Sequence, residues 1–368
     1  MFRRIKRILI IVLIILNIAY ALDREAINRE AYSKIPYMAR VEELPEEIPG
    51  EVVRKWITEE NLRVDEETQE NRNLEGINSV VAPSFGWTLR RTNMRAYPTD
   101  KAFHRGNPEI DLNQYTSVEP FTPVAVLHTS KDGKWLYVQV PFARGWIKKE
   151  DVVIKDREEL KRVLSLPFLV VVKPKVKVRD IEWSLGARIP YLDKREGFYK
   201  VLLPDGSTEW VELSQGFNEG YLDFSEEKAK EILHSLLGHP YDWGGKRGFW
   251  DCSSLVQGLF WVFGVELPRN SRQQAQIGKK IKERLESYDE LKDTLKDLPP
   301  FRTLLFFNGH VMIYGGVEEG EPVIYHALYR IKKDNREEYK PKRVVKNKLE
   351  SDELKNIYRR IISINVLP

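Results

Sequence analysis

Cys252 is the only cysteine among the 368 residues of this chain. A disulfide needs two cysteines, so no covalent cross-link within the chain can support its fold. Stability therefore has to come from apolar cores and from packing between domains. Hydrophobic residues make up 42% of the sequence and aromatic residues 11%, which suffices for ordinary globular cores. The length predicts more than one domain.

The N-terminus carries the pattern of a secretory signal. Basic residues cluster within residues 2–7, an apolar run covers residues 8–16, and residues 19–21 read Ala-Tyr-Ala, a small-x-small cleavage site. The run is shorter than the roughly 20 residues of a comfortable membrane span, so we expect cleavage after Ala21. An uncleaved anchor is the alternative, and it would be the only membrane contact. We expect an exported protein that is periplasmic, at the cell surface or extracellular.

The formal net charge of +4 is modest, and part of it lies in the N-terminal signal. A nucleic-acid-binding domain would concentrate Lys and Arg into a strongly basic patch or stripe. The charge balance therefore argues against nucleic acid as a partner.

Two stretches have the texture of small β-barrels. Residues 85–155 contain short β-branched and aromatic runs, with an Asp-Gly turn at 132–133 that predicts a hairpin. Residues 156–221 repeat this order, with a strand, an Asp-Gly turn at 205–206 and a strand around Trp210. Residues 22–84 are charged and predict helix and loop, including an amphipathic helix over 51–60.

From residue 222 the pattern changes to mixed helices and strands. Ser225 is a plausible N-cap for a helix over 225–237, and Cys252 opens a second helix that stops at Gly264. Gly315 and Gly316 are expected to end a strand that starts at His310. The remaining predicted elements are a charged helix over 281–298 and strands at 303–307, 310–314, 323–328 and 360–366.

Cys252 has two interpretations. A thiol at a helix N-terminus gains thiolate character from the helix dipole, which suits a nucleophile, whereas a free cysteine is also often a small buried hydrophobe. A nucleophile needs a base and a group that orients the base. Of the six histidines, His310 and His326 fall on predicted strands downstream, and a hairpin through residues 318–321 would bring them together. We predict Cys252 as nucleophile, His310 as base and His326 as orienting group.

Metal binding is the rival use of Cys and His. Zinc sites usually show close ligand pairs such as C-x-x-C or H-x-x-x-H, and the sequence contains neither. We therefore predict no metal site and no cofactor.

Four motifs follow one another in the C-terminal part: PYDWGG at 240–245, DCSSLV at 251–256, LPRNS at 267–271 followed by Gln274-Ala275, and GHVMIYGG at 309–316. In order and spacing they resemble the NlpC-type cell-wall cysteine peptidases, a papain-like family. Upstream, residues 89–99 are similar to the first bacterial SH3-like domain of a multi-domain subgroup. The resemblance implies an N-terminal segment (22–84), two small SH3-like β-barrels (85–155 and 156–221) and an α+β papain-like peptidase domain (222–368).

The family hydrolyses amide bonds in peptidoglycan stem peptides. The resemblance implies cleavage between γ-D-glutamate and the diamino acid through an acyl-enzyme, with stem peptides or muropeptides as partners. It assigns the nucleophile to Cys252, the base to His310 and the third polar position to His326.

The resemblance also suggests substrate-binding residues. Tyr241 matches a tyrosine at the site entrance, and Asp251 and Ser253 match residues that hold the free amine of an N-terminal L-alanine in some relatives. For Asp251, capping of its own helix is the alternative.

Two other functions remain open from the sequence. One is a wall-binding protein with an inactive peptidase domain, and the other is acyl transfer or amidase chemistry by the same thiol.

Overall fold

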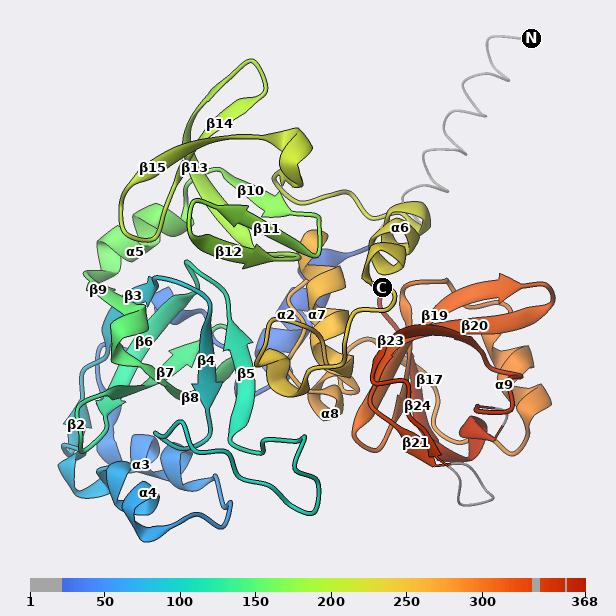
Figure 1. The fold of residues 1–368 in the computed structure, drawn as a ribbon, viewed down its shortest axis with the longest axis horizontal. Coiled ribbons are helices and arrows are strands. Elements are labelled where there is room, and N and C mark those ends of the chain that lie inside the picture. The colour runs from blue at the N-terminus through green and yellow to red at the C-terminus, as the bar shows by residue number, and fades with distance from the viewer. Residues whose placement is uncertain (1–21, 333–337, 355) are drawn as a thin grey trace.

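The computed structural model describes residues 22–332, 338–354 and 356–368 (Figure 1). The predicted signal at residues 1–21 lies outside the described residues. Within the described ranges, no helix is long and apolar enough to cross a membrane.

The N-terminal segment contacts both the first sheet and the C-terminal part of the chain. Helix α2 (Arg24–Lys34) lies against the C-terminal part, where the Asn28 side chain donates to the Gly264 carbonyl and accepts from the Glu266 amide. The predicted helix over 51–60 is confirmed as α3 (Gly50–Thr58), which packs with Trp146 of the first sheet. The segment also contains β1 (Ile48–Pro49), α4 (Glu66–Asn71) and β2 (Val80–Val81).

The first β unit is an antiparallel seven-stranded sheet in the order β5-β4-β8-β7-β6-β3-β9. The predicted hairpin is present, and Gly133 in its turn has φ +70°, a conformation that glycine adopts without strain. Its strands are β3 (Ser84–Thr88), β4 (Thr92–Arg95), β5 (Gln114–Val118), β6 (Pro123–Thr129), β7 (Trp135–Val140), β8 (Ala143–Lys148) and β9 (Val152–Lys155).

A second β unit follows α5 (Arg157–Leu164). Its main sheet has the order β15-β14-β13-β10-β16, and β11 and β12 form a separate hairpin. The two units share a core: Trp183 stacks on Phe121 at 6.3 Å, and Trp87 Nε1 donates to the Pro204 carbonyl. The strands are β10 (Phe168–Val171), β11 (Lys175–Val178), β12 (Ile181–Ser184), β13 (Arg188–Arg195), β14 (Phe198–Leu202), β15 (Thr208–Glu212) and β16 (Phe217–Glu219).

Six strands of the C-terminal part form an antiparallel sheet in the order β17-β24-β18-β19-β20-β23, and β21 and β22 form a separate two-stranded sheet. Helix α7 (Cys252–Val262) packs against β19 and β20 near the centre of the molecule (Figure 1). The other helices are α6 (Glu226–Leu236), α8 (Ser271–Gln274) and α9 (Tyr288–Leu295). The strands are β17 (Lys279–Lys282), β18 (Thr303–Phe307), β19 (His310–Glu318), β20 (Glu321–Leu328), β21 (Ile331–Lys332), β22 (Glu338–Tyr339), β23 (Arg343–Lys348) and β24 (Ile361–Val366).

Two predictions for this part were wrong in detail. The first residues of the predicted helix over 281–298 belong to β17, which pairs with β24, so only α9 is helical there. Gly315 and Gly316 do not end β19. The pairing with β20 instead shifts register between Tyr314 and Val317, so these glycines form an irregularity inside a longer strand.

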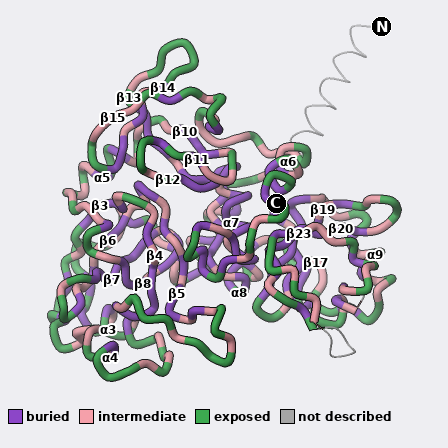
Figure 2. Tube along the Cα trace, in the orientation of Figure 1, coloured by how far each residue is buried: buried purple, intermediate pink, exposed green. Residues whose placement is uncertain are grey.

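One apolar core extends from the first β unit into the C-terminal part. It joins Val138 and Ile147 of the first sheet to Leu255 and Leu259 of α7 and to Ile313 of β19. Figure 2 shows buried residues running along α7 and into both neighbouring sheets. Burial of this shared surface holds the first sheet against the helix that begins at Cys252.

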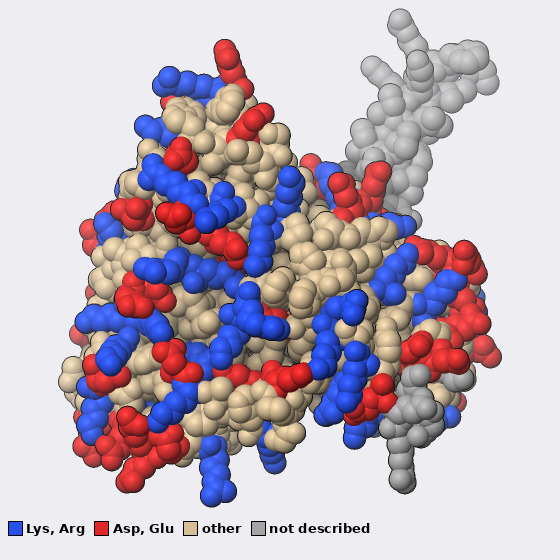
Figure 3. Space-filling model, viewed as in Figure 1, with Lys and Arg blue, Asp and Glu red and all other residues tan. Residues whose placement is uncertain are grey.

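Charged side chains of both signs are interspersed on the face shown in Figure 3. Exposed charges also form ion pairs, as Lys101 and Glu67 do at 2.8 Å. Exposed pairs each contribute only about 0–1 kcal/mol, so the cores dominate the stability of the fold.

Candidate active site

The Cys252 thiol lies at the first turn of α7, as predicted. Asp251 is the N-cap, and one of its carboxylate oxygens accepts a hydrogen bond from the Ser254 amide at 2.8 Å. The Ser254 hydroxyl accepts from the Asp251 amide in return. Cys252 is 7% exposed, and its Sγ lies 3.9 Å from the Gly309 carbonyl oxygen. This local capping fixes the direction in which the thiol points.

The environment of Cys252 favours the neutral thiol. Burial raises the pKa of Cys252 to about 12, and the negative charge of Asp251 acts in the same direction. Burial and the charge of Asp251 therefore oppose the thiolate character expected at a helix N-terminus. The thiol has to lose its proton to a base during reaction.

The predicted hairpin brings the two histidines together. His310 opens β19, His326 lies on β20, and His310 Nε2 is 2.8 Å from His326 Nδ1. His326 Nε2 is in turn 3.1 Å from Oδ1 of Asn347 on β23. An amide oxygen only accepts, so His326 Nε2 carries a proton and His326 Nδ1 accepts from His310 Nε2. This order leaves His310 Nδ1 as an unprotonated nitrogen.

Both histidines are held neutral. Burial lowers the pKa of His310 well below 6.5, and His326 lowers it further. Burial also lowers the pKa of His326 to about 4, although its bond to Asn347 opposes this shift. The imidazole of His310 is therefore neutral and can accept a proton at neutral pH.

Asn347 was missed from the sequence. Its Nδ2 donates toward the Tyr339 hydroxyl at 3.4 Å, which directs Oδ1 toward His326. Residues 343–348 could have been read as a strand from their β-branched pair. The partner of that strand, β20, is settled only by the tertiary fold.

Asp251 is occupied by partners within the chain. Arg269 Nη2 lies 2.6 Å from one of its carboxylate oxygens, Arg269 Nη1 lies 3.1 Å from the other, and the Gly244 amide also donates to Asp251. The Ser253 hydroxyl accepts from Arg269 at 2.9 Å and lies 3.3 Å from Asp251. These bonds favour the capping alternative for Asp251 over recognition of a substrate amine.

The first β unit reaches this network directly. Arg269 Nε donates to the Thr116 hydroxyl on β5 at 2.6 Å, and Gln114 Nε2 on the same strand donates to the Gly244 carbonyl at 3.0 Å. Gly244 has φ +60°, and a Cβ there would lie 2.6 Å from Gln114 Cγ. Strand β5 therefore supports the loop before Cys252.

Tyr241 stands at the edge of the site. Its backbone amide donates to the Lys342 carbonyl, and its ring lies 5.6 Å from that of Tyr329. Burial raises the pKa of Tyr241, and Cys252 and Asp251 add to this effect. Within the described ranges, no hydrogen-bond partner engages the Tyr241 hydroxyl.

No group of three or more His, Cys, Asp or Glu side chains in the part of the chain that the structure describes could hold a metal ion. His310 and His326 contact each other, and the Cys252 thiol lies 3.9 Å from the carbonyl oxygen of Gly309, the residue before His310.

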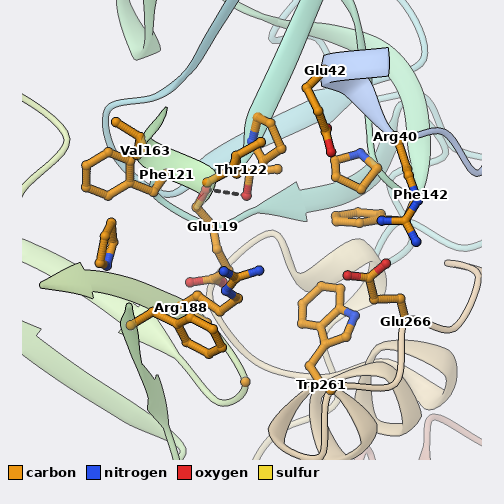
Figure 4. A pocket seen from close by; sticks show the side chains of 18 of the residues that line it. Arg40, Glu42, Glu119, Phe121, Thr122, Phe142, Val163, Arg188, Trp261 and Glu266 are labelled. Atoms are coloured by element: carbon orange, nitrogen blue, oxygen red, sulfur yellow. Dashed lines mark hydrogen bonds between the residues drawn. The ribbon is translucent and has the colours of Figure 1, made fainter. Parts of the chain in front are cut away.

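A cavity of about 340 Å³ lies elsewhere, where α2, both β units and α7 meet (Figure 4). Its walls include Trp261 and Phe142, whose rings are 5.3 Å apart, together with Arg188 and Glu119. Its lining does not include Cys252, His310 or His326. It is a gap between packed domains, separate from the thiol site.

Sequence relatives point to cell-wall peptidases. The γ-D-glutamyl-L-lysine dipeptidyl-peptidase of Bacillus cereus is 29% identical over 182 residues, which cover 43% of this chain and 54% of that protein. The enzyme with the same name in Bacillus subtilis is 28% identical over 223 residues, or 55% of this chain and 64% of that protein. The alignments thus span between half and two thirds of these relatives.

Solved structures share the fold. An NlpC/P60 endopeptidase from Photobacterium damselae subsp. piscicida superposes with a TM-score of 0.67 at 18% identity, covering 93% of this chain and 92% of that one. An NlpC/P60 family protein from Bacillus cereus gives 0.56 at 18% identity and covers 77% of this chain and all of that one.

Family models match two regions of the sequence. Residues 100–148 match the SH3 domain of the SH3b1 type, and residues 238–345 match the NlpC/P60 family. The second region contains Cys252, His310 and His326. The chain therefore contains an NlpC/P60 domain preceded by an SH3 domain of the SH3b1 type.

Proposed function

We propose that this protein is an exported cysteine endopeptidase that hydrolyses the γ-D-glutamyl–diamino acid bond of peptidoglycan stem peptides. The observation that carries the proposal is the thiol at the N-terminus of α7 next to the ordered series His310–His326–Asn347. The names of the Bacillus relatives support the substrate, and the predicted signal supports export.

The chemistry follows from the tautomers. His310 Nδ1 takes the proton of Cys252 as Sγ attacks the γ-glutamyl carbonyl carbon, and a tetrahedral oxyanion forms. The Cys252 amide at the helix start and the Tyr241 hydroxyl are the proposed donors to that oxyanion. His310 then gives the proton to the leaving amine, the C–N bond breaks, and water attacks the acyl-enzyme to release the acid and the thiol.

In this proposal each domain has its own role. Residues 222–368 form the peptidase unit, and residues 85–155 and 156–221 form two SH3-like units. The first SH3-like unit shapes the cleft through Thr116 and Gln114. Residues 22–84 act as a packing arm that joins the first sheet to the peptidase unit.

The test is digestion of the peptide L-Ala-γ-D-Glu-L-Lys by wild type and Cys252→Ala, analysed by mass spectrometry. Products from wild type whose summed mass equals substrate plus one water support hydrolysis. Equal product from both proteins would refute the thiol mechanism. Binding without turnover would support the inactive wall-binding alternative, and products lacking the added water would support acyl transfer.

A further inference from the structure

A pocket of about 260 Å³ opens beside Tyr241, separate from the cavity between the domains. Three segments that are distant in sequence form it: the β4–β5 loop of the first β unit, the loop before Cys252, and the turn after β20. The lining residues are Arg105, Asn107, Ile110, Leu112, Tyr241, Trp243, Tyr329 and Arg330.

The β4–β5 loop is tied across to the peptidase unit. Asn107 Nδ2 donates to the Tyr329 hydroxyl at 2.9 Å, and Lys342 Nζ lies 2.7 Å from the Glu109 carboxylate. Lys246 binds Asp111 at 2.6 Å at the other end of the loop. These bonds hold the loop over the peptidase unit, so the pocket is built before any substrate arrives.

The charge of the pocket is positive. Arg105 is exposed and has no hydrogen-bond or ion-pair partner among the described residues. Arg330 uses one terminal nitrogen to bind Glu338 at 3.0 Å, and this pair lies at the surface. The nearby Glu109 carboxylate is already engaged by Lys342 and the Tyr329 hydroxyl. The two guanidinium groups therefore border aromatic walls that lack a competing free carboxylate.

The pocket adjoins the turn that follows the strand carrying His326. Tyr329 and Arg330 directly follow β20, the strand that carries His326, and the Tyr241 ring contacts that of Tyr329. In the proposed reaction His310 protonates the leaving amine, so we place the leaving half of the substrate on the side of His310 and its hairpin partner His326. An amino acid attached through that amine would extend toward the guanidinium groups.

We propose that this pocket binds the carboxylate of the leaving half, that is, the free carboxyl group of the diamino acid residue. A planar guanidinium can bind a carboxylate through two parallel hydrogen bonds, and the aromatic rings would cover the aliphatic part of the side chain. This inference rests on the proposed peptidase function and adds a preference for stem peptides that end at or close to the diamino acid.

Three peptides test the assignment. The first is L-Ala-γ-D-Glu-L-Lys with a free C-terminus, the second carries a C-terminal carboxamide, and the third carries a carboxamide on the glutamyl α-carboxyl group. For wild type we expect kcat/KM to fall about tenfold on C-terminal amidation. The double variant Arg105→Gln/Arg330→Gln should lose most of this preference and cleave the free acid and the carboxamide at similar rates. Arg195→Gln removes an exposed charge from the β13–β14 hairpin and should behave as wild type.

Each outcome decides the assignment. An unchanged free-acid preference in the double variant would overturn it, as would the absence of a preference in wild type. If the double variant instead loses discrimination against the glutamyl amide, the pocket binds the acyl half and the assignment is wrong. Failure of wild type to cleave any of the three peptides would refute the proposed function itself. Thermal unfolding of the double variant verifies that it folds.

Discussion

His310 Nε2 lies 2.8 Å from His326 Nδ1, and this contact leaves Nδ1 of His310 as the nitrogen that can accept the proton of the thiol. The Asn347 side-chain oxygen accepts from His326 Nε2, which leaves His326 Nδ1 to accept from His310 Nε2. Three residues on the adjacent strands β19, β20 and β23 therefore determine the tautomers of both histidines.

The first prediction concerns the pH dependence of activity. In the proposed mechanism catalysis needs neutral His310, and burial lowers the pKa of His310 well below 6.5. The acid limb of kcat/KM should therefore have its midpoint clearly below 6.5, and activity should persist in mildly acidic buffer. A pH–rate profile of the wild type measures the midpoint of this acid limb. A midpoint at or above 6.5 would contradict the buried neutral imidazole.

The second prediction concerns stability. The pKa of His326 is about 4 in the folded protein and 6.5 without the fold, so between these values the unfolded chain binds more protons. The free energy of unfolding should fall as pH decreases from about 6.5 toward 4. Urea unfolding at several pH values measures this slope. His326→Gln cannot titrate and should show a shallower slope; an equal slope would show that other groups dominate.

The third prediction separates orientation from packing at Asn347. Asn347→Leu removes the acceptor of His326 and should lower kcat by about 10- to 100-fold, as loss of an orienting partner typically does. Asn347→Asp keeps an acceptor but adds a negative charge, which raises the pKa of His326. It should retain more activity than Asn347→Leu and change the pH profile. Equal loss in both variants would indicate a packing role alone.

The fourth prediction tests the hydrogen bond between Thr116 of the first β unit and Arg269, the partner of Asp251. Thr116→Val leaves the buried Arg269 Nε without its acceptor, which costs about 1–3 kcal/mol of unfolding free energy. Thr208→Val on β15 is the matched control and should change stability by less than about 0.5 kcal/mol. Thermal and urea unfolding compare the two. Similar effects would show that the Thr116 bond contributes little.

The fifth prediction concerns the buried ion pair between Asp251 and Arg269. Arg269→Met leaves a buried carboxylate unpaired and should cost about 3–5 kcal/mol. The double variant Asp251→Asn/Arg269→Met should lose much less than the sum of the single changes, because no unpaired charge remains. A double-mutant cycle measures this coupling. Strict additivity would show that the pair does not act as a unit.

Local features could be predicted from the sequence because a few neighbouring residues determine them. The start of α7 at Cys252 depends on Asp251 and Ser254, three positions apart. The approach of His310 to His326 depends on one hairpin between consecutive strands. The helix predicted over 281–298 is present only as α9, and its first two residues are lost to β17 because Lys279–Lys282 pairs with β24 at the far end of the chain.

The sequence by itself determined the lone thiol, the helix that presents it and the two histidines beside it, because capping and hairpin formation act over short chain distances. Three contacts depend on the tertiary fold: Asn347 accepts from His326, Arg269 pairs with Asp251, and Thr116 of the first β unit accepts from Arg269. The tertiary fold also decided that Cys252 rests as a neutral thiol. The physical reason is burial: a pKa and a partner far along the chain depend on which surfaces pack together, and local pattern does not specify that packing.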